Sequence, residues 1–222
     1  MPLIVVTSFK GGAGKTMLAA NLAVGLRSVG WDVTAVDANP QDTLKLHFGF
    51  DAVDGRGVAG SGVDVVPFAD DTSGQVSELI EAAARRMVIV DAPSLPSASA
   101  RTFARAADVL VVATPTDAGS YAALSLADAQ TFLADDGVVS KAIVVANQFD
   151  QVARLQRSVL ALLHETFGDK LAATIERDPI VDEALASRRT VLLHDQTSKA
   201  ARSLVALAIH VDRLCSPNGE LN

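Results

Sequence analysis

The sequence contains little of several residue types, and each shortage excludes a class of site. Cys215 is the only cysteine among 222 residues, so no internal disulfide and no Cys–x–x–Cys metal or iron–sulfur site can form. The four histidines are scattered along the chain and suggest no metal site. Aromatic residues make up only 5%, whereas Ala, Val and Leu are abundant. This composition favours buried parallel strands packed on helices.

Positive charge and long apolar runs are also scarce. The chain has 19 Lys and Arg against 26 Asp and Glu, a formal net charge of −7, and its only adjacent basic pairs are Arg85–Arg86 and Arg188–Arg189. We therefore expect no extended DNA-binding surface. No stretch reaches the roughly 18 apolar residues of a membrane-spanning helix, and the N-terminal MPLIVVTSFK lacks the basic region of a signal peptide. The sequence predicts a soluble, cytoplasmic protein.

What is present is an alternation of continuous apolar runs with helical patterns. The strands are predicted at Leu3–Val6, Val33–Val36, Val63–Val66, Met87–Val90, Val109–Ala113, Ala142–Ala146 and Leu171–Ile175. Helical periodicity follows most of them; the first helix carries Leu18, Leu22 and Leu26 and is ended by Gly30, and the others are expected at about 73–86, 97–107, 119–134, 151–167 and 198–214. Such alternation predicts an α/β fold: one doubly wound, mainly parallel sheet of seven to eight strands with helices on both faces.

We expect a single domain over residues 1–215, followed by a polar tail at 216–222. The one irregular stretch, Asp51–Gly62, is rich in glycine and too short for a domain linker, so we expect a surface loop there.

The first strand and helix enclose the stretch KGGAGKT, residues 10–16. Glycines allow the backbone to wrap closely around phosphate, so that successive N–H groups and the helix N-terminus face the anion. Lys15 is positioned to reach the β- and γ-phosphates, and the Thr16 hydroxyl to ligate Mg²⁺. The predicted nucleotide-binding residues at this loop are Lys10, Gly11, Gly12, Ala13, Gly14, Lys15, Thr16 and Met17. We expect ATP or ADP with Mg²⁺ as the ligand.

With its additional lysine, this loop resembles the deviant Walker A signature of the ParA/MinD superfamily of dimerising ATPases, and the resemblance covers nearly the whole chain. It implies that two subunits sandwich two ATP molecules, and that Lys10 reaches the γ-phosphate held by the partner subunit. A cation there would stabilise charge and link dimerisation to ATP. The alternative is a solvent-exposed lysine at the start of a loop.

Two carboxylates follow strands on the expected ligand side of the sheet. Asp37 ends the second predicted strand and Asp91 the fourth, in a Walker-B-like VIVDAP, so Asp37 and Asp91 join Thr16 as the predicted Mg²⁺ residues. Each could instead serve only as a turn former or helix cap. The family usually has Asp-x-Asp in its second motif, where this chain has Asp37-Ala38-Asn39. An amide cannot accept a proton as a carboxylate does, so we expect ATP hydrolysis to be slow, or absent without a partner. The predicted catalytic residues are Lys10, Lys15, Asp37 and Asn39.

Three further stretches resemble the BcsQ (YhjQ) branch of cellulose-biosynthesis proteins, namely Val36–Phe50, Ala146–Asp150 and Arg177–Val191. This resemblance implies that Asn147, after the sixth predicted strand, contacts the adenine and that the segment at Asp178–Pro179 lines its other side. Asn147 could instead cap the following helix.

The resemblance implies an ATP-dependent homodimeric switch that acts with cellulose synthase subunits or an adaptor at the inner membrane. Recruitment would occur through protein, since the last helix lacks the basic membrane anchor of MinD-type proteins and the single Tyr121 excludes the tyrosine cluster of the bacterial tyrosine kinases. Two alternatives stay open. One is a non-hydrolysing, ATP-bound dimeric scaffold, which Asn39 favours; the other is a ParA-type DNA partition ATPase, which the acidic composition disfavours.

Overall fold

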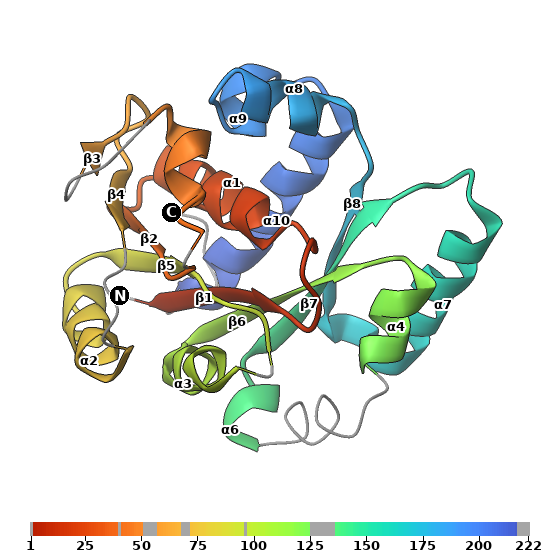
Figure 1. The fold of residues 1–222 in the computed structure, drawn as a ribbon, viewed down its shortest axis with the longest axis horizontal. Helices are drawn as coiled ribbons and strands as arrows, with labels where there is room; N and C mark the ends of the chain where they lie inside the picture. Colours follow the sequence, from red (N-terminus) through yellow and green to blue (C-terminus); the bar gives the residue numbers. More distant parts are fainter. Residues whose placement is uncertain are drawn as a thin grey trace.

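The computed structural model describes residues 2–39, 41–50, 57–67, 72–95, 97–124 and 136–216, and its centre is an eight-stranded sheet (Figure 1). The strands are β1 (Leu3–Ser8), β2 (Val33–Asp37), β3 (Gly57–Val58), β4 (Asp64–Pro67), β5 (Met87–Asp91), β6 (Val109–Pro115), β7 (Ala142–Phe149) and β8 (Leu171–Glu176). Their spatial order is β3-β4-β2-β5-β1-β6-β7-β8, and every neighbouring pair is parallel except β3 with β4. The predicted doubly wound, mainly parallel sheet is confirmed.

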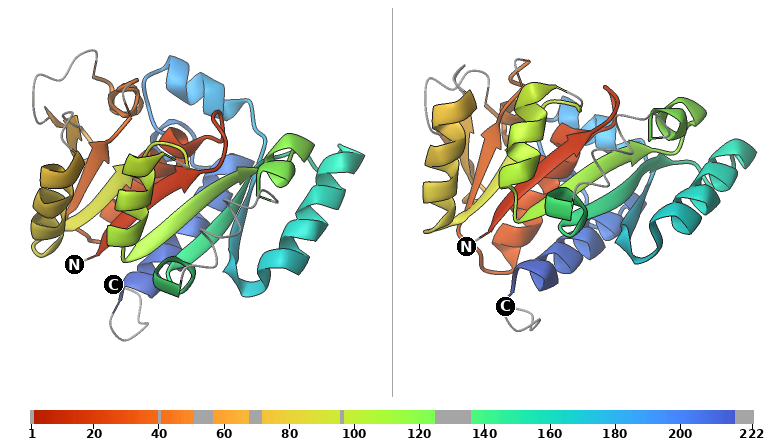
Figure 2. Two further views of the ribbon diagram at one scale, coloured as in Figure 1. Left: turned by 60° about the horizontal axis from the view of Figure 1, so that its bottom comes forward. Right: turned by 90° about the horizontal axis from the view of Figure 1, so that it is seen from below.

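Helices cover both faces of the sheet, as the two views of Figure 2 show. One face carries α1 (Lys15–Ser28), α8 (Ile180–Ala186), α9 (Val191–His194) and α10 (Lys199–Cys215), with the 3₁₀ helix η1 (Leu44–Phe48) beside α1. The other carries α2 (Thr72–Ala83), α3 (Ala98–Ala106) and α6 (Asp136–Val139). Near the β8 edge lie α4 (Ala118–Leu124), α7 (Arg154–Phe167) and the short η2 (Gly168–Lys170). Among the described residues no helix is long and apolar enough to cross a membrane.

The continuous apolar runs form strands because both faces of the sheet are buried. Along β1, Ile4 and Val6 pack into the cluster under α1 and α10, while Leu3 and Val5 pack into the cluster under α2 and α3. Side chains alternate between faces along a strand, so a strand covered on both sides must be apolar at every position. All six residues of β1 are buried.

The structure corrects two local expectations and tests a third only in part. The glycine-rich segment is not entirely a loop: Gly57 and Val58 pair antiparallel with β4, while residues 51–56 lie outside the described residues. The helix expected at 119–134 agrees with α4 (Ala118–Leu124) over its first part, and the rest of that prediction lies outside the described residues. The helix expected from Gln151 begins at Arg154, because Asp150 Oδ1 accepts a hydrogen bond from the Val152 amide at 2.9 Å and forms a turn first. Of the predicted tail at 216–222, only Ser216 is described.

The winding of the sheet creates its ligand edge. After β1 the chain crosses by α1 toward β2 on one side, and after β6 it continues toward β7 on the other. Neighbouring strands whose crossovers leave in opposite directions open a crevice at their carboxyl ends, where open α/β sheets bind ligands. The KGGAGKT loop leaves β1 at this end.

Candidate functional site

The loop between β1 and α1 has the backbone conformation of an anion cradle. Gly12 and Gly14 have φ angles of 74° and 79°, in the left-handed region that side chains disfavour. Gly14 also has no room for a side chain, since a Cβ there would lie 2.4 Å from Asn147 Nδ2. Ala13 between them is fully buried. The loop is thereby held open toward solvent with the N-terminus of α1 directly behind it.

Lys15, the first residue of α1, turns back along the loop. Its Nζ donates to Ser94 Oγ at 3.0 Å, and Ser94 Oγ lies 3.1 Å from Ser8 Oγ. Burial lowers the pKa of Lys15, and the charge of Asp91 opposes this shift. Sequence reasoning missed Ser94; the signal available was its place three residues after the strand-end Asp91. In this arrangement Ser94 holds the ammonium group near the mouth of the loop.

Thr16 and Asp91 form the next contact, at the end of β5. Thr16 Oγ1 donates to Asp91 Oδ2 at 2.6 Å. Asp91 is completely buried, and burial raises its pKa to about 7. Within the described chain its second oxygen, Oδ1, has no hydrogen-bond partner. A buried carboxylate oxygen without a donor, next to a hydroxyl, fits a hydrated divalent cation, because hard oxygen ligands are what Mg²⁺ prefers.

Asp37, at the end of β2, is bound to its own downstream segment. Its Oδ1 accepts from the Asn39 amide at 2.9 Å and its Oδ2 from the Leu44 amide at 2.8 Å. Burial raises its pKa despite these hydrogen bonds. Asn39 in turn donates through Nδ2 to the backbone carbonyl of Asp91 at 2.9 Å. Asp37 and Asn39 thus connect the ends of β2 and β5 and fix the start of η1.

Lys10 lies apart from Lys15, on the outer side of the loop. Its Nζ is 3.1 Å from Asp117 Oδ1, and the two side chains are 47% and 44% exposed. Asp117 also accepts from the backbone amide and the hydroxyl of Ser120 at the start of α4. Burial would raise the pKa of Asp117, but the hydrogen bonds from Ser120 and Lys10 outweigh it and lower the pKa. The first lysine of the motif is therefore held by an exposed ion pair, a partner that nothing in the sequence indicated.

A cavity of 260 Å³ opens beside Gly14, and Lys10 is not among its lining residues. It brings together four predicted nucleotide residues: Gly14 from the loop, Met17 from α1, Asn147 from β7 and Asp178 from the loop after β8. The remaining lining residues are Gln148, Ile175, Glu176, Arg177, Val181 and Asp182. Pro179 does not line this cavity; it is the N-cap of α8 and lines a separate cavity with Lys199 and Arg202. The position of the cavity next to the loop suits a base attached to phosphates in the loop.

Asn147 and Gln148 hold the loop from beneath. Asn147 is buried within β7 and donates through Nδ2 to the Ala13 carbonyl at 2.8 Å. Gln148, with a φ of 59°, donates through Nε2 to the Gly12 carbonyl at 2.9 Å. Asn147 therefore borders the cavity while its amide hydrogen bonds to the loop, and it does not cap α7, whose N-cap is Ala153.

Asp178 has structural hydrogen bonds of its own. Its Oδ1 accepts from the Ile180 amide at 3.2 Å and its Oδ2 from the Ala200 amide at 3.3 Å, so it joins the starts of α8 and α10. Among the described residues no cluster of three or more His, Cys, Asp or Glu could hold a metal by itself. Any cation at Thr16 and Asp91 would therefore need oxygen ligands from a bound nucleotide or water.

Comparison with known proteins agrees with this arrangement. A model of the CobQ/CobB/MinD/ParA nucleotide binding domain matches residues 4–191. The chromosome-partitioning ATPase Soj of Thermus thermophilus is 29% identical over 94% of both chains. The maintenance of carboxysome distribution protein A of Gloeobacter kilaueensis is 36% identical over 51% of this chain and 49% of that protein.

Solved structures show the same fold. The septum site-determining protein MinD of Pyrococcus horikoshii, complexed with Mg-ADP, superposes with a TM-score of 0.80 at 20% identity, covering 99% of this chain and 98% of that one. A ParA family ATPase of Chlorobium tepidum superposes with a TM-score of 0.81 at 18% identity, covering 95% and 98%. At these identities the likeness concerns the fold, whereas the family model spans the loop, both strand-end carboxylates and the cavity beside Gly14. The chain belongs to the CobQ/CobB/MinD/ParA nucleotide binding domain family.

Proposed function

We propose that this protein is an ATP-dependent dimerising switch of the ParA/MinD type. One observation carries the proposal: the loop presents two lysines with different surroundings. Lys15 is half-buried against Ser94 at the mouth of the cradle, whereas Lys10 is exposed on the outer rim. The inner lysine suits phosphate bound in its own subunit, and the outer one suits phosphate bound elsewhere.

The nucleotide would be ATP or ADP with Mg²⁺. The amides of Gly11–Gly14 and the Lys15 ammonium would hold the phosphates, and Met17, Asn147 and the segment at Asp178 would border the base. Thr16 and Asp91 would hold the Mg²⁺ shell, with Asp37 on the water side. When bound, the cation would neutralise charge on the phosphate oxygens.

Nucleotide-dependent dimerisation would follow from Lys10. Two copies facing each other across their loops would each send Lys10 to the other's γ-phosphate, so that only the triphosphate completes the contact. The domain for this activity would be residues 1–215.

Hydrolysis is the step in which Asn39 matters. The amide of Asn39 is hydrogen-bonded to the Asp91 carbonyl and has no proton-accepting carboxylate, so turnover would be slow or would require a partner. A scaffold in which ATP only locks the dimer is the limiting case of the same proposal.

As the cellular role we propose cellulose secretion, with recruitment from the cytoplasm to the inner membrane by synthase subunits or an adaptor. The support is the motif resemblance of Val36–Phe50, Ala146–Asp150 and Arg177–Val191 to BcsQ proteins.

Light scattering with ATP and Mg²⁺, with ADP and without nucleotide tests the switch. We expect the molar mass of the wild type to double with ATP and in neither of the other samples. Lys10→Ala should keep the mass of a monomer with ATP, while it still binds a fluorescent ATP analogue. Lys15→Ala should lose both. If Lys10→Ala dimerises with ATP like the wild type, the role given to Lys10 is wrong. Phosphate release above the Lys15→Ala level would refute the pure scaffold.

A partition ATPase is the second candidate, and the similarity to Soj and to the chromosome partitioning protein ParA of Caulobacter vibrioides favours it. Retention on duplex DNA that requires ATP and falls steeply with salt would support this role. Co-purification with cellulose synthase subunits, without retention on DNA, would support the role in cellulose secretion.

A further inference from the structure

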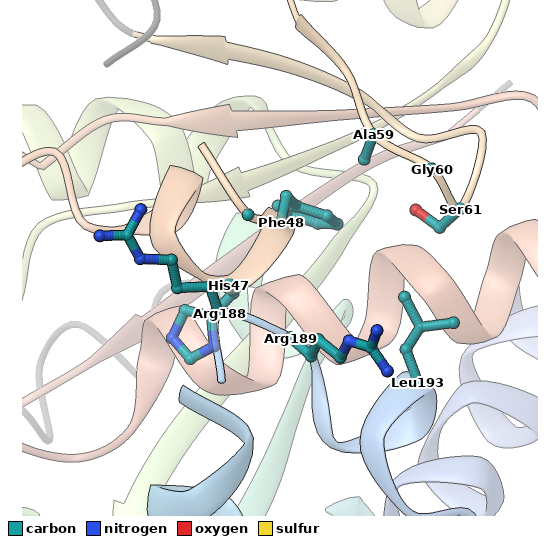
Figure 3. Close-up of a pocket in the computed structure, with 9 residues that line it drawn as sticks. His47, Phe48, Ala59, Gly60, Ser61, Arg188, Arg189 and Leu193 are labelled. Carbon is teal, nitrogen blue, oxygen red and sulfur yellow. The ribbon is translucent and has the colours of Figure 1, made fainter. Parts of the chain in front are cut away.

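A second cavity, of 400 Å³, lies on the α1 face of the sheet and shares no lining residue with the nucleotide site (Figure 3). Its walls come from three segments: the end of η1, the turn between β3 and β4, and the chain from α8 to α9. They contribute His47, Phe48, Gly49, Ala59, Gly60, Ser61, Arg188, Arg189 and Leu193. Its volume is within the range of small-ligand and side-chain pockets.

Two of the sequence stretches that resemble the BcsQ branch meet here. The residues His47–Gly49 belong to Val36–Phe50, and Arg188–Arg189 belong to Arg177–Val191. The nucleotide function uses the first part of each stretch, at Asp37 and Asp178, and leaves these later residues without a role.

The surface of the cavity is apolar with one available positive charge. Phe48 and Ala59 line it, and Leu193 is 44% exposed at its edge. Among the described residues the Arg189 guanidinium has no ion-pair partner, and Figure 3 shows it pointing away from that of Arg188. An apolar recess beside an unpaired guanidinium matches an apolar group that carries a carboxylate nearby.

Two further groups refine this chemistry. Ser61 lines the cavity, and its Oγ is buried with no hydrogen-bond partner in the described part of the chain, so a turn of this side chain toward an occupant would satisfy it. His47 is buried, and burial lowers its pKa to about 4, so it is neutral at pH 7 and adds no positive charge. The attraction for an anion therefore comes from Arg189, in a chain whose formal net charge is −7.

The apolar surface continues outside the cavity. Val58, next to the lining residue Ala59, is 69% exposed on the short edge strand β3. An apolar centre that extends onto the open surface with a charged rim is typical of a protein interface, whereas a metabolite site is usually enclosed.

One wall of the cavity is connected to the nucleotide site. Asp37 accepts a hydrogen bond from the Leu44 amide at the first residue of η1, and His47–Gly49 at the other end of η1 line the cavity. Recruitment of Asp37 by a nucleotide-bound cation would compete with this hydrogen bond and shift η1. This connection rests on the proposed function; the chemistry of the cavity does not.

We infer that this cavity docks a segment of a partner protein that carries a large apolar side chain flanked by acidic residues. The apolar side chain enters between Phe48 and Leu193, and a carboxylate pairs with Arg189. The nucleotide state alters the affinity through η1.

The test uses two fluorescein-labelled peptides, Gly-Glu-Leu-Glu-Gly and its basic match Gly-Lys-Leu-Lys-Gly, in anisotropy titrations. The wild type should bind the acidic peptide at least about tenfold more tightly than the basic one. Arg189→Glu should reverse this preference, and Leu193→Ala should weaken both peptides. The control is Arg154→Glu, which makes the same charge change at an exposed position of α7, near the other edge of the sheet (Figure 1). It should change the affinity for neither peptide. These positions are exposed, so the variants should fold.

The outcomes are separable when binding of a fluorescent ATP analogue is measured on the same samples. The docking site is overturned if the wild type binds both peptides equally. It is also overturned if Arg154→Glu abolishes the preference for the acidic peptide and Arg189→Glu leaves it intact. Both conclusions hold whether or not ATP binds. Peptide binding without ATP binding supports the docking site and refutes the proposed function. Peptide affinity that ATP with Mg²⁺ leaves unchanged overturns the connection through η1. Duplex DNA bound through Arg189 in place of the peptides would also overturn the inference.

Discussion

The ion pair between Lys10 and Asp117 gives the sharpest test of the proposed switch, because it engages the ammonium group that the proposal assigns to a partner subunit. We consider the substitution Asp117→Asn. It removes the negative charge that faces Lys10 but keeps a side-chain oxygen, which can still accept from the Ser120 amide, now at 2.9 Å, and cap α4. The monomer should therefore fold as before, with Lys10 released.

The size of the effect follows from the exposure of the pair. Both side chains are nearly half exposed, and such surface ion pairs contribute about 0.2–1 kcal/mol. Each subunit must break its pair to offer Lys10 to the partner, so a dimer loses the pair twice, about 0.4–2 kcal/mol in total. Without the pair the ATP-bound dimer should be about 2- to 30-fold tighter.

Sedimentation velocity across a concentration series, with ATP and Mg²⁺, measures this dimer dissociation constant. Ser120→Ala is the matched control, because it removes the hydroxyl hydrogen bond to Asp117 at 2.7 Å without touching Lys10. Its dissociation constant should equal that of the wild type. The double variant Lys10→Ala, Asp117→Asn should be as weak as Lys10→Ala. A dimer of Asp117→Asn that is no tighter than the wild type, at normal ATP binding, would refute the view that Asp117 restrains Lys10.

Three further predictions concern folding and reactivity. Gly14→Ala should lower the free energy of unfolding by at least about 2 kcal/mol, because it adds both left-handed backbone strain and a clash with Asn147. In Gly12→Ala the new methyl group meets nothing within 4 Å, so this variant should lose only the strain energy of about 1–2 kcal/mol. Urea denaturation compares the two variants, and equal losses of stability would contradict the clash. The pKa of Asp91 is raised from 3.8 to about 7, so between these pH values the folded nucleotide-free protein binds more protons than the unfolded chain. Its free energy of unfolding should therefore fall as pH rises through this range, by up to about 1.4 kcal/mol per pH unit, and Asp91→Asn should lack this slope. Parallel curves of unfolding free energy against pH for the two proteins would show that burial does not raise the pKa of Asp91. Burial raises the pKa of Cys215 to about 12, so at pH 8 its thiolate fraction should be about a thousandfold below that of a free thiol. Its reaction with a disulfide reagent should therefore be slower than that of a free thiol and rise about tenfold per pH unit up to pH 10, and a plateau near pH 8.5 would contradict this.

The sheet was predictable because its signal is local. Each strand inside the sheet is buried on both faces, so a run such as Leu3–Val6 is apolar at every residue and cannot be a half-exposed strand. The first helix was predictable for the same kind of reason, since Leu18, Leu22 and Leu26 repeat at helical spacing and all are buried. Where burial is nearly complete, the sequence pattern and the structure contain the same information.

The short elements could not be predicted, because contacts from other parts of the chain stabilise them. The 3₁₀ helix η1 starts where Asp37, seven residues upstream of Leu44, accepts its first amide. The turn into α9 is fixed by Asn21 Oδ1, which accepts from the Leu192 amide at 3.0 Å across 171 residues. Strand β3 exists only as the antiparallel neighbour of β4, in a sequence whose glycines favour a loop. No local pattern contains these partners.

The candidate site divides in the same way. The sequence predicted the positions of Lys15 and Thr16 on a glycine-rich loop and of Asp91 at a strand end, because the loop conformation depends on its own glycines and the strand on its apolar run. It did not predict that Lys10 is held by Asp117, 107 residues away, or that Ser94 holds Lys15. These side-chain partners depend on which strand ends the fold places next to the loop.

Position 39 shows why the residue types alone are an incomplete guide to chemistry. From sequence, Asn39 counts as the loss of a carboxylate that would position water. In the structure its amide nitrogen donates to the backbone carbonyl of Asp91, and its own backbone amide donates to Asp37. A carboxylate at this position could not donate, and it would add a negative charge beside two acids whose pKa values burial already raises. The amide of Asn39 therefore holds the ends of β2 and β5 together through a hydrogen bond that a carboxylate could not make. An acid at position 39 would have to gain more from a cation at Asp91, should one bind there, than it loses with this hydrogen bond.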